Sequence, residues 1–238
     1  WDWLKGIQSY RNMMDFLKDE EFLKLEKEFR FLSRARSLHG ELENLAYVIV
    51  DIETTGLNPE ADEIIEIGAI KVEGGELKDI FNKLIKPEKK ITEDITGLTG
   101  ITQDMLESEL PIKPVIAQFA NFIGNSALVA HNSEFDISFL KSSFKKHLNL
   151  ELNNFTTCTL LISRDILPNL DNHKLHTVAR YFGIEVSNRH RAIGDAELTY
   201  QVWLKFIEKL KERNVLTKKD LESYLVSLSK SNTEVVPF

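Results

Sequence analysis

The chain has 238 residues, of which 42% are hydrophobic and 28% are charged, the proportions of a globular protein. No apolar run approaches the roughly 20 residues needed to span a bilayer, and no signal-peptide pattern is present, so we expect no membrane association. A single cysteine, Cys158, excludes an internal disulfide and fits a reducing, cytoplasmic compartment. The formal net charge of −7 argues against a polyanionic partner, but it is a weak guide if several of the acids hold metal ions.

Residues 1–45 form the first predicted region, a helical N-terminal extension. No Gly or Pro interrupts the stretch from Asp19 to His39, and four apolar residues recur there at a spacing of three or four. These residues are Phe22, Leu25, Phe29 and Leu32. Such spacing draws one apolar stripe along a helix. We expect the stripe to dock on the body of the protein, with a separate partner-binding arm as the alternative.

Short strands follow the extension, because β-branched and aromatic residues gather there in brief runs between turn residues. The first run begins at Tyr47 and ends in two acids, and the second spans residues 64–72. A Gly-Gly pair at residues 74–75 predicts a tight hairpin turn into a third strand at residues 77–85. A fourth, brief apolar strand is expected at residues 127–131.

Apolar residues at helical spacing predict helices between and after these strands. The predicted helices cover residues 103–107, 111–123, 135–147, 175–182, 195–213 and 216–229, whereas residues 91–102 are expected to form a loop. A hairpin followed by alternating strands and helices predicts an α/β fold, in which a mixed sheet carries helices on both faces. We place the core domain at residues 46–213 and a C-terminal helix and tail at residues 214–238.

Two carboxylates at the end of the first strand are the feature around which the rest of the chain can be interpreted. Asp51 and Glu53 are two positions apart, so their side chains point to the same face of a strand. Two like charges side by side at the edge of an apolar core cost on the order of several kcal/mol unless a cation lies between them. Thr54, Thr55 and Gly56 then turn the chain, which keeps the pair near the surface.

Two further segments place acids where a strand or a loop leads into a helix. His131 and Asn132 precede Asp136, and His190 precedes Asp195 by five positions. Taken alone, Asp195 is a plausible helix N-cap, Asp136 is an ordinary acid at a helix start, and His190 is a surface histidine. The combination of all the segments, rather than any one residue, is what indicates a shared site.

The order and spacing of these segments resemble the motifs of the DEDDh 3′–5′ exonucleases, which are named for four acids and a histidine. The matching stretches are Asp51-Ile52-Glu53-Thr54-Thr55-Gly56, His131-Asn132-x-x-Phe135-Asp136 and His190-x4-Asp195. The run Ile64-Ile65-Glu66-Ile67-Gly68-Ala69 adds a likeness to the proofreading exonucleases of bacterial DNA polymerase III. The resemblance covers residues 47–210 and none of the N-terminal extension.

The resemblance implies an RNase H-like fold and a site for two divalent metal ions, Mg²⁺ or Mn²⁺. In such a site Asp51 bridges both ions, Glu53 and Asp195 complete one position, and Asp136 helps to hold the other. Hard oxygen ligands of this kind suit hard divalent cations. His190 is expected to be the general base that takes a proton from the attacking water, because an imidazole titrates near neutral pH.

The resemblance also implies a nucleic-acid substrate, most simply the single-stranded or frayed 3′ end of DNA. The positions that bind the terminal nucleotide in the family correspond here to Thr54, Thr55, Gly56 and Leu57. His131 and Asn132 are expected to contact the substrate backbone. A DNA polymerase subunit is a further expected partner.

Two alternatives remain open at this point. An RNA-trimming exonuclease of the same superfamily would carry the same acids, because the choice between DNA and RNA depends on contacts to one hydroxyl group. A catalytically silent module that binds nucleic acid or a polymerase belongs to a different functional class. The presence of all four acids and the histidine argues against the silent module.

Overall fold

The computed structural model describes residues 41–186 and 191–233. The predicted helix of the N-terminal extension, the segment 187–190 with His190, and residues 234–238 lie outside these ranges. The observed architecture is therefore that of the predicted core domain and the C-terminal helix, and the boundaries between the three predicted regions stay a prediction.

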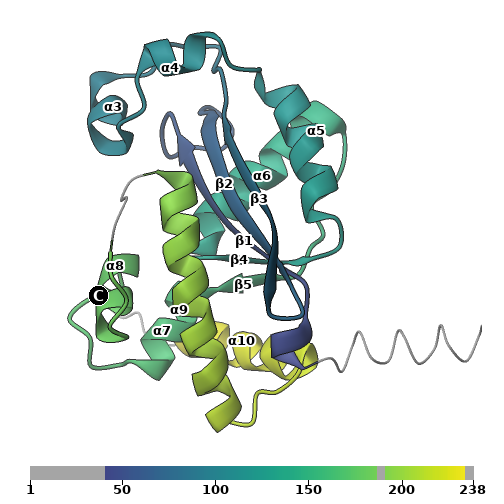
Figure 1. Cartoon of the computed structure of the whole chain (residues 1–238), viewed down its shortest axis with the longest axis vertical. Coiled ribbons are helices and arrows are strands. Elements are labelled where there is room, and N and C mark those ends of the chain that lie inside the picture. The colour runs from purple at the N-terminus through teal and green to yellow at the C-terminus, as the bar shows by residue number, and fades with distance from the viewer. Residues whose placement is uncertain (1–40, 187–190, 234–238) are drawn as a thin grey trace, which may run out of the picture.

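Five strands of the described chain form one mixed sheet in the order β3-β2-β1-β4-β5 (Figure 1). β1, β2 and β3 pair antiparallel, and β4 and β5 continue the sheet parallel to β1. The strands are β1 (Tyr47–Thr54), β2 (Ile64–Glu73), β3 (Glu76–Leu84), β4 (Ala127–Ala130) and β5 (Thr156–Cys158). The predicted mixed sheet is confirmed, but β5 was missed, because three residues are too few to show an alternating pattern.

Helices cover both faces of the sheet, as the sequence predicts (Figure 1). The elements packed on one face are α5 (Ile112–Ile123), α6 (Ser133–Ser143) and the π-helical turn η2 (Phe144–Leu148). Those packed on the other face are α7 (Thr159–Ile166), α8 (Leu175–Tyr181), α9 (Ala192–Glu212) and α10 (Lys218–Thr233). The remaining short helices are η1 (Leu42–Asn44), α3 (Glu93–Thr99) and α4 (Gln103–Glu107).

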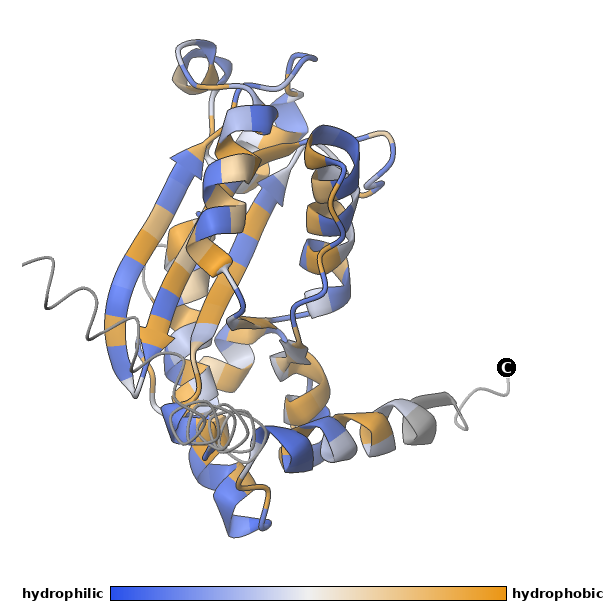
Figure 2. Cartoon of the chain, turned by 90° about the vertical axis from the view of Figure 1, so that its right-hand side faces the viewer, coloured by the Kyte–Doolittle hydropathy of each residue, from blue (hydrophilic) through white to orange (hydrophobic). Residues whose placement is uncertain are grey.

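The central strand β1 divides its side chains between these two layers. Val48 and Val50 are buried in the core under α5 and α6, whereas Tyr47 and Ile49 are buried in the core under α9. The Tyr47 ring meets Trp203 of α9 edge-to-face, with 5.6 Å between ring centroids. Figure 2 shows the corresponding hydropathy pattern, with apolar residues recurring along the strands and on the helices. Because the alternation continues along the strand, its last odd-numbered side chains also project toward α9.

Residues 91–102 contain the helix α3 where the sequence predicted a loop, so that prediction was wrong. The Thr92 hydroxyl accepts a hydrogen bond of 3.3 Å from the backbone N–H of Ile95 and so caps the first turn. Gly100, with a φ of 70°, ends the helix in the left-handed conformation. The threonine and glycine that suggested a loop are therefore the two caps of a short helix.

α9 begins at Ala192, three residues before the predicted start at Asp195. Asp195 already lies in the first turn, where its backbone N–H bonds to the carbonyl of Arg191 at 3.0 Å. The alternative in which Asp195 caps the helix is therefore wrong.

The predicted β2–β3 hairpin is present, with φ values of 60° and 78° at its two turn residues, Gly74 and Gly75. Positive φ at both positions suits glycine and matches the right-handed twist of the flanking strands. Across the described residues, every helix is too short or too polar to cross a bilayer.

Candidate metal centre

Two acids at the end of β1 meet a third acid from α9. Asp51 and Glu53 project toward the face that α9 covers, and Asp195 lies in the first turn of that helix. Oxygens from these three carboxylates all lie within 4.8 Å of one another, and all three residues are half-buried. One cation could contact all three oxygens, since metal–oxygen bonds to Mg²⁺ or Ca²⁺ are about 2.0–2.6 Å long. The structure thus brings together three of the four predicted metal ligands.

The fourth predicted ligand, Asp136, lies beside this group in the first turn of α6 and is only 3% exposed. Its Oδ1 accepts a hydrogen bond of 3.2 Å from the backbone N–H of Ile52. The pairing of β4 with β1 ends at Ile49, so beyond that point the Asp136 carboxylate takes the place of a strand partner. This bond holds Asp136 against the strand segment that carries Asp51 and Glu53.

The protein raises the pKa of three of these carboxyl groups. Burial is the largest cause for Asp51, whose pKa lies well above its usual range, followed by repulsion from Asp136 and Asp195. Burial, then repulsion from Glu66, raises the pKa of Glu53 to about 7, and burial raises the pKa of Asp136 to about 8. A divalent cation would neutralise this repulsion, and an all-carboxylate donor set suits a hard cation. The arrangement therefore fits a metal site.

A fifth carboxylate, Glu66 of β2, lies directly opposite Glu53 in the β1–β2 pairing and has no exposed surface. Arg191 donates to it through Nη2 at 2.7 Å, and the backbone N–H of Ala192 donates at 3.0 Å. Sequence reasoning assigned no role to Glu66 or Arg191. The available signal was an acid inside the apolar run of the second strand, which is costly unless a partner pairs with it.

The residues after β1 form an exposed lip next to the acids. The backbone N–H of Glu63 donates to the Thr55 hydroxyl at 2.9 Å, which closes the loop on itself. A Cβ atom at Gly56 would lie 2.4–2.6 Å from the Asp62 carboxylate, so a larger residue there would force that side chain to move. Leu57 is 84% exposed at the tip of the loop. The geometry leaves an apolar side chain in solvent beside the acid cluster.

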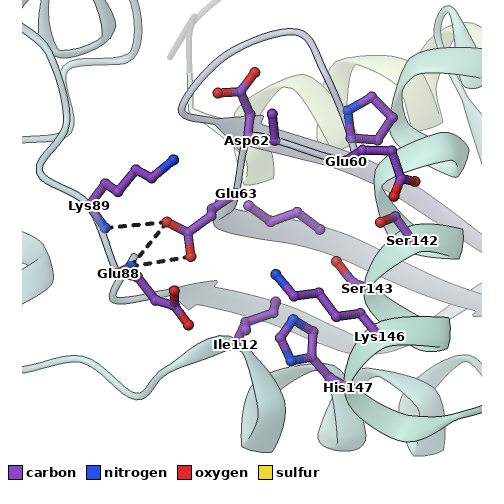
Figure 3. Close-up of a pocket in the computed structure, with 13 residues that line it drawn as sticks. Glu60, Asp62, Glu63, Glu88, Lys89, Ile112, Ser142, Ser143, Lys146 and His147 are labelled. Atoms are coloured by element: carbon purple, nitrogen blue, oxygen red, sulfur yellow. Dashed lines mark hydrogen bonds between the residues drawn. The ribbon is translucent and has the colours of Figure 1, made fainter.

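Behind the lip lies a cavity of 230 Å³, which Figure 3 shows between the loop after β1 and the C-terminal end of α6. The Glu63 carboxylate accepts hydrogen bonds there from the backbone N–H groups of Glu88 and Lys89, at 3.0 and 3.4 Å. Lys146 and His147 line the opposite wall (Figure 3). None of the clustered acids borders this cavity, so it is distinct from the metal centre.

His131 does not have a free ring nitrogen. Nε2 lies 2.9 Å from the carbonyl oxygen of His173, which can only accept, so Nε2 carries the proton, and Nδ1 bonds to the Thr159 hydroxyl at 2.9 Å. Burial lowers the pKa of His131 to about 4, which keeps the ring neutral. The ring of His131 therefore links the end of β4 to the first residue of α7 and to the segment before α8. The predicted contact of His131 with substrate stays a prediction.

Asn132 and His190 are the remaining predicted substrate and catalytic positions. Asn132 has a φ of 64° and stands immediately before α6, so it marks the sharp turn between β4 and that helix. His190 lies outside the described residues, directly before the anchored Arg191. The contact of Asn132 with substrate and the role of His190 as a base stay predictions.

A mixed sheet that carries clustered carboxylates on its central strand and on a helix crossing it defines the RNase H-like class of metal-dependent nuclease folds. A comparison with family models places the chain within this class. The model described as "Exonuclease" matches residues 48–203, which is more than half of the chain, and the protein belongs to this exonuclease family.

Curated relatives identified by sequence are bacterial polymerases. The chain is 38% identical over 190 residues to the PolC-type DNA polymerase III of Thermotoga petrophila, and this alignment covers 80% of the chain but 14% of the relative. It is 41% identical over 178 residues to the PolC-type DNA polymerase III of Bacillus subtilis, covering 74% of the chain and 12% of that relative. The chain thus spans only a small part of the length of these relatives.

Solved structures with the same fold include several exonucleases. Exonuclease X in complex with 5′ overhanging duplex DNA superposes with a TM-score of 0.59 and 22% identity, over 74% of this chain and 98% of the other. The nuclease domain of 3′hExo, described as a DEDDh family member bound to rAMP, gives 0.62 and 19%, over 71% and 95%. Escherichia coli exonuclease I with a dT13 oligonucleotide gives 0.62 and 18%, over 72% and 42%. These likenesses confirm the predicted RNase H-like fold.

Proposed function

We propose that this domain is a metal-dependent 3′–5′ exonuclease that releases nucleoside monophosphates from single-stranded or frayed DNA 3′ ends. The observation that carries the proposal is the convergence of Asp51, Glu53 and Asp195 within 4.8 Å, with Asp136 held against the same strand. A silent binding module would have no need to bury so much like charge, because each such carboxylate lowers the stability of the metal-free fold.

Two ions, Mg²⁺ or Mn²⁺, are the proposed cofactors. When bound, they supply a polarised water and neutralise charge on the scissile phosphate. Asp51 would hold the shared position in this proposal, because Asp136 and Asp195 are the two acids that repel it most strongly. Glu53 and Asp195 complete one position, and Asp136 contributes to the other. Burial of these acids orients their oxygens before any ion arrives.

His190 is the proposed general base. It precedes Asp195 by five positions and adjoins Arg191, whose guanidinium is fixed on Glu66. His131, the other histidine of the motifs, is a poor candidate, because its pKa is about 4 and both of its ring nitrogens are bound. A base must accept a proton near neutral pH, which is the range in which an unperturbed imidazole titrates.

The lip formed by Thr55, Gly56 and Leu57, together with Thr54 buried beneath it at the end of β1, is the proposed site of the terminal nucleotide. Leu57 is the most exposed of the large apolar side chains in the described chain, and contact with a base would remove it from water. Backbone N–H groups in the turn would meet a phosphate or the 3′-hydroxyl. Asn132, at the turn before α6, is proposed to contact the substrate backbone. An unstacked 3′ end is required, so a mispaired end is cleaved faster than a paired one.

DNA is the preferred substrate in this proposal because the sequence relatives carry the name DNA polymerase III, and a polymerase is the corresponding partner. The proposed setting is the cytoplasm, where bacterial DNA is replicated. The competing candidate, RNA trimming, is favoured by one observation only, the likeness to a nuclease domain described as bound to rAMP.

A digestion assay tests the proposal. A 5′-labelled single DNA strand incubated with the protein and Mg²⁺ is expected to shorten in single-nucleotide steps from its 3′ end, and EDTA is expected to stop the reaction. Matched RNA of the same sequence, and DNA duplexes with paired or mispaired 3′ ends, complete the set.

Asp51→Asn should abolish shortening, whereas Glu208→Gln, which removes an exposed acid from the same helix as Asp195, should leave it unchanged. Faster shortening of RNA than of DNA would replace the DNA assignment with RNA trimming. Failure to shorten either strand with Mg²⁺ or Mn²⁺ would sink the exonuclease proposal.

A further inference from the structure

Glu66 has an unusual place for a carboxylate. It lies in the apolar middle of β2 with no exposed surface, and its cross-strand neighbour on β1 is another acid, Glu53. Like charges directly opposite each other in a sheet are destabilising, and a buried carboxylate without partners costs on the order of several kcal/mol. Specific contacts to the Glu66 carboxylate must therefore offset this cost, and these contacts indicate the role of Glu66.

Within the described residues, the compensating contacts come from two consecutive residues at the start of α9. The guanidinium of Arg191 donates to Glu66 through Nε, at 3.1 and 3.2 Å, and through Nη2, at 2.7 Å. The backbone N–H of Ala192 donates to the other carboxylate oxygen at 3.0 Å. The Arg191 side chain is only 37% exposed, and its fork geometry fits a carboxylate in two places at once. Strand and helix are thus joined by a network rather than by a single bond.

Glu66 also replaces the missing N-cap of α9. The residue at the N-cap position is Arg191, whose side chain accepts nothing from the helix. The first N–H groups of a helix need an acceptor, and the helix end favours a negative charge. The Glu66 carboxylate meets both needs from the neighbouring strand, because it accepts from Ala192 at the first helical position.

Gly68, two residues along the same strand, brings the helix end unusually close to the sheet. A Cβ atom at this position would lie 2.2–2.6 Å from backbone atoms of Ala192 and Ile193. No L-residue with a side chain fits at such distances without moving the helix. The absence of a side chain at residue 68 therefore fixes how closely the first turn of α9 approaches β2, while Glu66 fixes its position along the strand.

We propose that Glu66, Arg191 and Gly68 form a seat for the N-terminal turn of α9 that positions Asp195 against Asp51 and Glu53. Asp195 lies in the first turn of α9, and its backbone N–H bonds to the carbonyl of Arg191 at 3.0 Å, so the position of Arg191 sets that of Asp195. Figure 1 shows α9 crossing β1 and β2 from this end. Glu66 and Arg191 are positioning residues in this account and do not bind the ion. The inference rests on the proposed metal-dependent function of the site.

The charge of Arg191 has a second consequence. Asp51, Glu53, Asp195 and Glu66 are acidic side chains in one small region, and the Arg191 guanidinium pairs with Glu66 there. Removing the guanidinium would leave the Glu66 carboxylate without this partner and directly opposite Glu53 in the strand pair. Repulsion would then push the two strands, or the helix, away from the separation that suits a metal ion.

The test measures metal binding and catalysis separately in Glu66→Gln, Arg191→Gln and the double variant. Calorimetric titration of the full chain with Mn²⁺, without substrate, gives the metal affinity. Steady-state digestion of a single-stranded DNA oligonucleotide gives kcat and KM, and thermal unfolding in EDTA gives the Tm. Arg213→Gln is the matched control, because Arg213 pairs with Asp165 just after the opposite end of α9.

Both single variants are expected to bind Mn²⁺ about 10-fold more weakly and to lose about 10- to 100-fold in kcat, the range typical of residues that orient metal ligands. KM for the oligonucleotide should stay within about twofold, because the lip is untouched. The double variant should lose no more than the worse single variant, since both changes break one unit. Arg191→Lys should recover little, because an ammonium cannot reproduce the fork.

Unchanged Mn²⁺ affinity and kcat in variants whose Tm has fallen would overturn the inference and leave the pair as a stabilising bridge only. A wild-type protein that binds Mn²⁺ but digests no DNA would sink the proposed function, while the Mn²⁺ titrations would still decide the inference. A wild-type protein that binds no Mn²⁺ would overturn both. Gly68→Ala offers an independent route, since it keeps every charge and is expected to weaken Mn²⁺ binding by displacing α9 alone.

Discussion

The two halves of α9 do different work on the same sheet. Its C-terminal half packs Trp203 and Phe206 into the apolar core, and Trp203 meets the Tyr47 ring at the start of β1. Its N-terminal turn lies instead among carboxylates, where Asp195 approaches Asp51 at the other end of that strand. One half contributes stability through apolar burial, and the other places like charges together at a cost in stability. Packing of the C-terminal half of α9 against the core thus holds the helix in place, and the fixed helix holds Asp195 beside Asp51.

The largest expected effect comes from a substitution in the acid cluster beside the N-terminal turn of α9. Asp51→Asn removes the central acid of the cluster, so activity should fall by more than the roughly 100-fold seen when only an orienting partner is lost. The same substitution should raise the Tm in EDTA, because a neutral amide replaces a carboxyl group that is destabilised by desolvation and by its acidic neighbours. Digestion of labelled DNA and thermal unfolding check the two outcomes. Loss of activity together with a lower Tm would mean that Asp51 is structural.

The second prediction concerns a substitution in the C-terminal half of α9, which packs into the apolar core. Trp203→Ala removes a side chain that is 1% exposed and should lower the free energy of unfolding by about 3–5 kcal/mol. Urea unfolding measures this loss. At a temperature where the variant is still folded, its Mn²⁺ affinity should remain within a few-fold of the wild-type value. A loss of metal binding as complete as in Asp51→Asn would show that the two halves are not separable.

The third prediction concerns pH and the metal-free protein. The folded-state pKa values of Glu53 and Asp136, about 7 and about 8, exceed the ordinary values of 4.5 and 3.8. The folded state therefore binds more protons than the unfolded state in this range, and the free energy of unfolding falls as pH rises. Each such proton changes it by up to about 1.4 kcal/mol per pH unit. His131 acts in the opposite sense below its ordinary pKa of 6.5, because folding lowers its pKa to about 4.

The informative window therefore lies above pH 6.5, where His131 is neutral in the folded state and mostly neutral in the unfolded state. Thermal unfolding in EDTA between pH 6.5 and about pH 8 should show a falling Tm, and Asp51→Asn should flatten the slope. Excess Mg²⁺ should weaken or reverse the dependence, because metal binding requires the deprotonated acids. A Tm in EDTA that is flat or rises across this window would contradict the raised pKa values.

The smallest expected effect comes from the far end of α9. Arg213→Gln breaks a partly exposed ion pair with Asp165, and such pairs contribute about 0–1 kcal/mol. The free energy of unfolding should change by no more than this, with activity unchanged, and the effect should shrink further at high salt. A change in kcat would show that contacts at the far end of α9, and not only those of Glu66, Arg191 and Gly68, position Asp195 in the acid cluster.

The sequence predicted most of the sheet and the identity of the acids for clear physical reasons. Alternation in β1 placed Asp51 and Glu53 on one face, and the Gly-Gly pair at residues 74–75 marked the hairpin. Local patterns fail where an element is very short or where its caps resemble loop residues. The strand at residues 156–158 was missed and the helix α3 was predicted as a loop for those reasons.

What the sequence determined by itself is the set of chemical groups: the acids, their faces on strand and helix, and the motif order that indicates an exonuclease. The tertiary structure decided which groups act on one another. Glu66 gained its partner from a residue 125 positions away, and both ring nitrogens of His131 are bound by Thr159 and His173, which lie far from it in the sequence. Burial and long-range pairing set these outcomes, and both depend on the packing of distant segments, which local periodicity does not record.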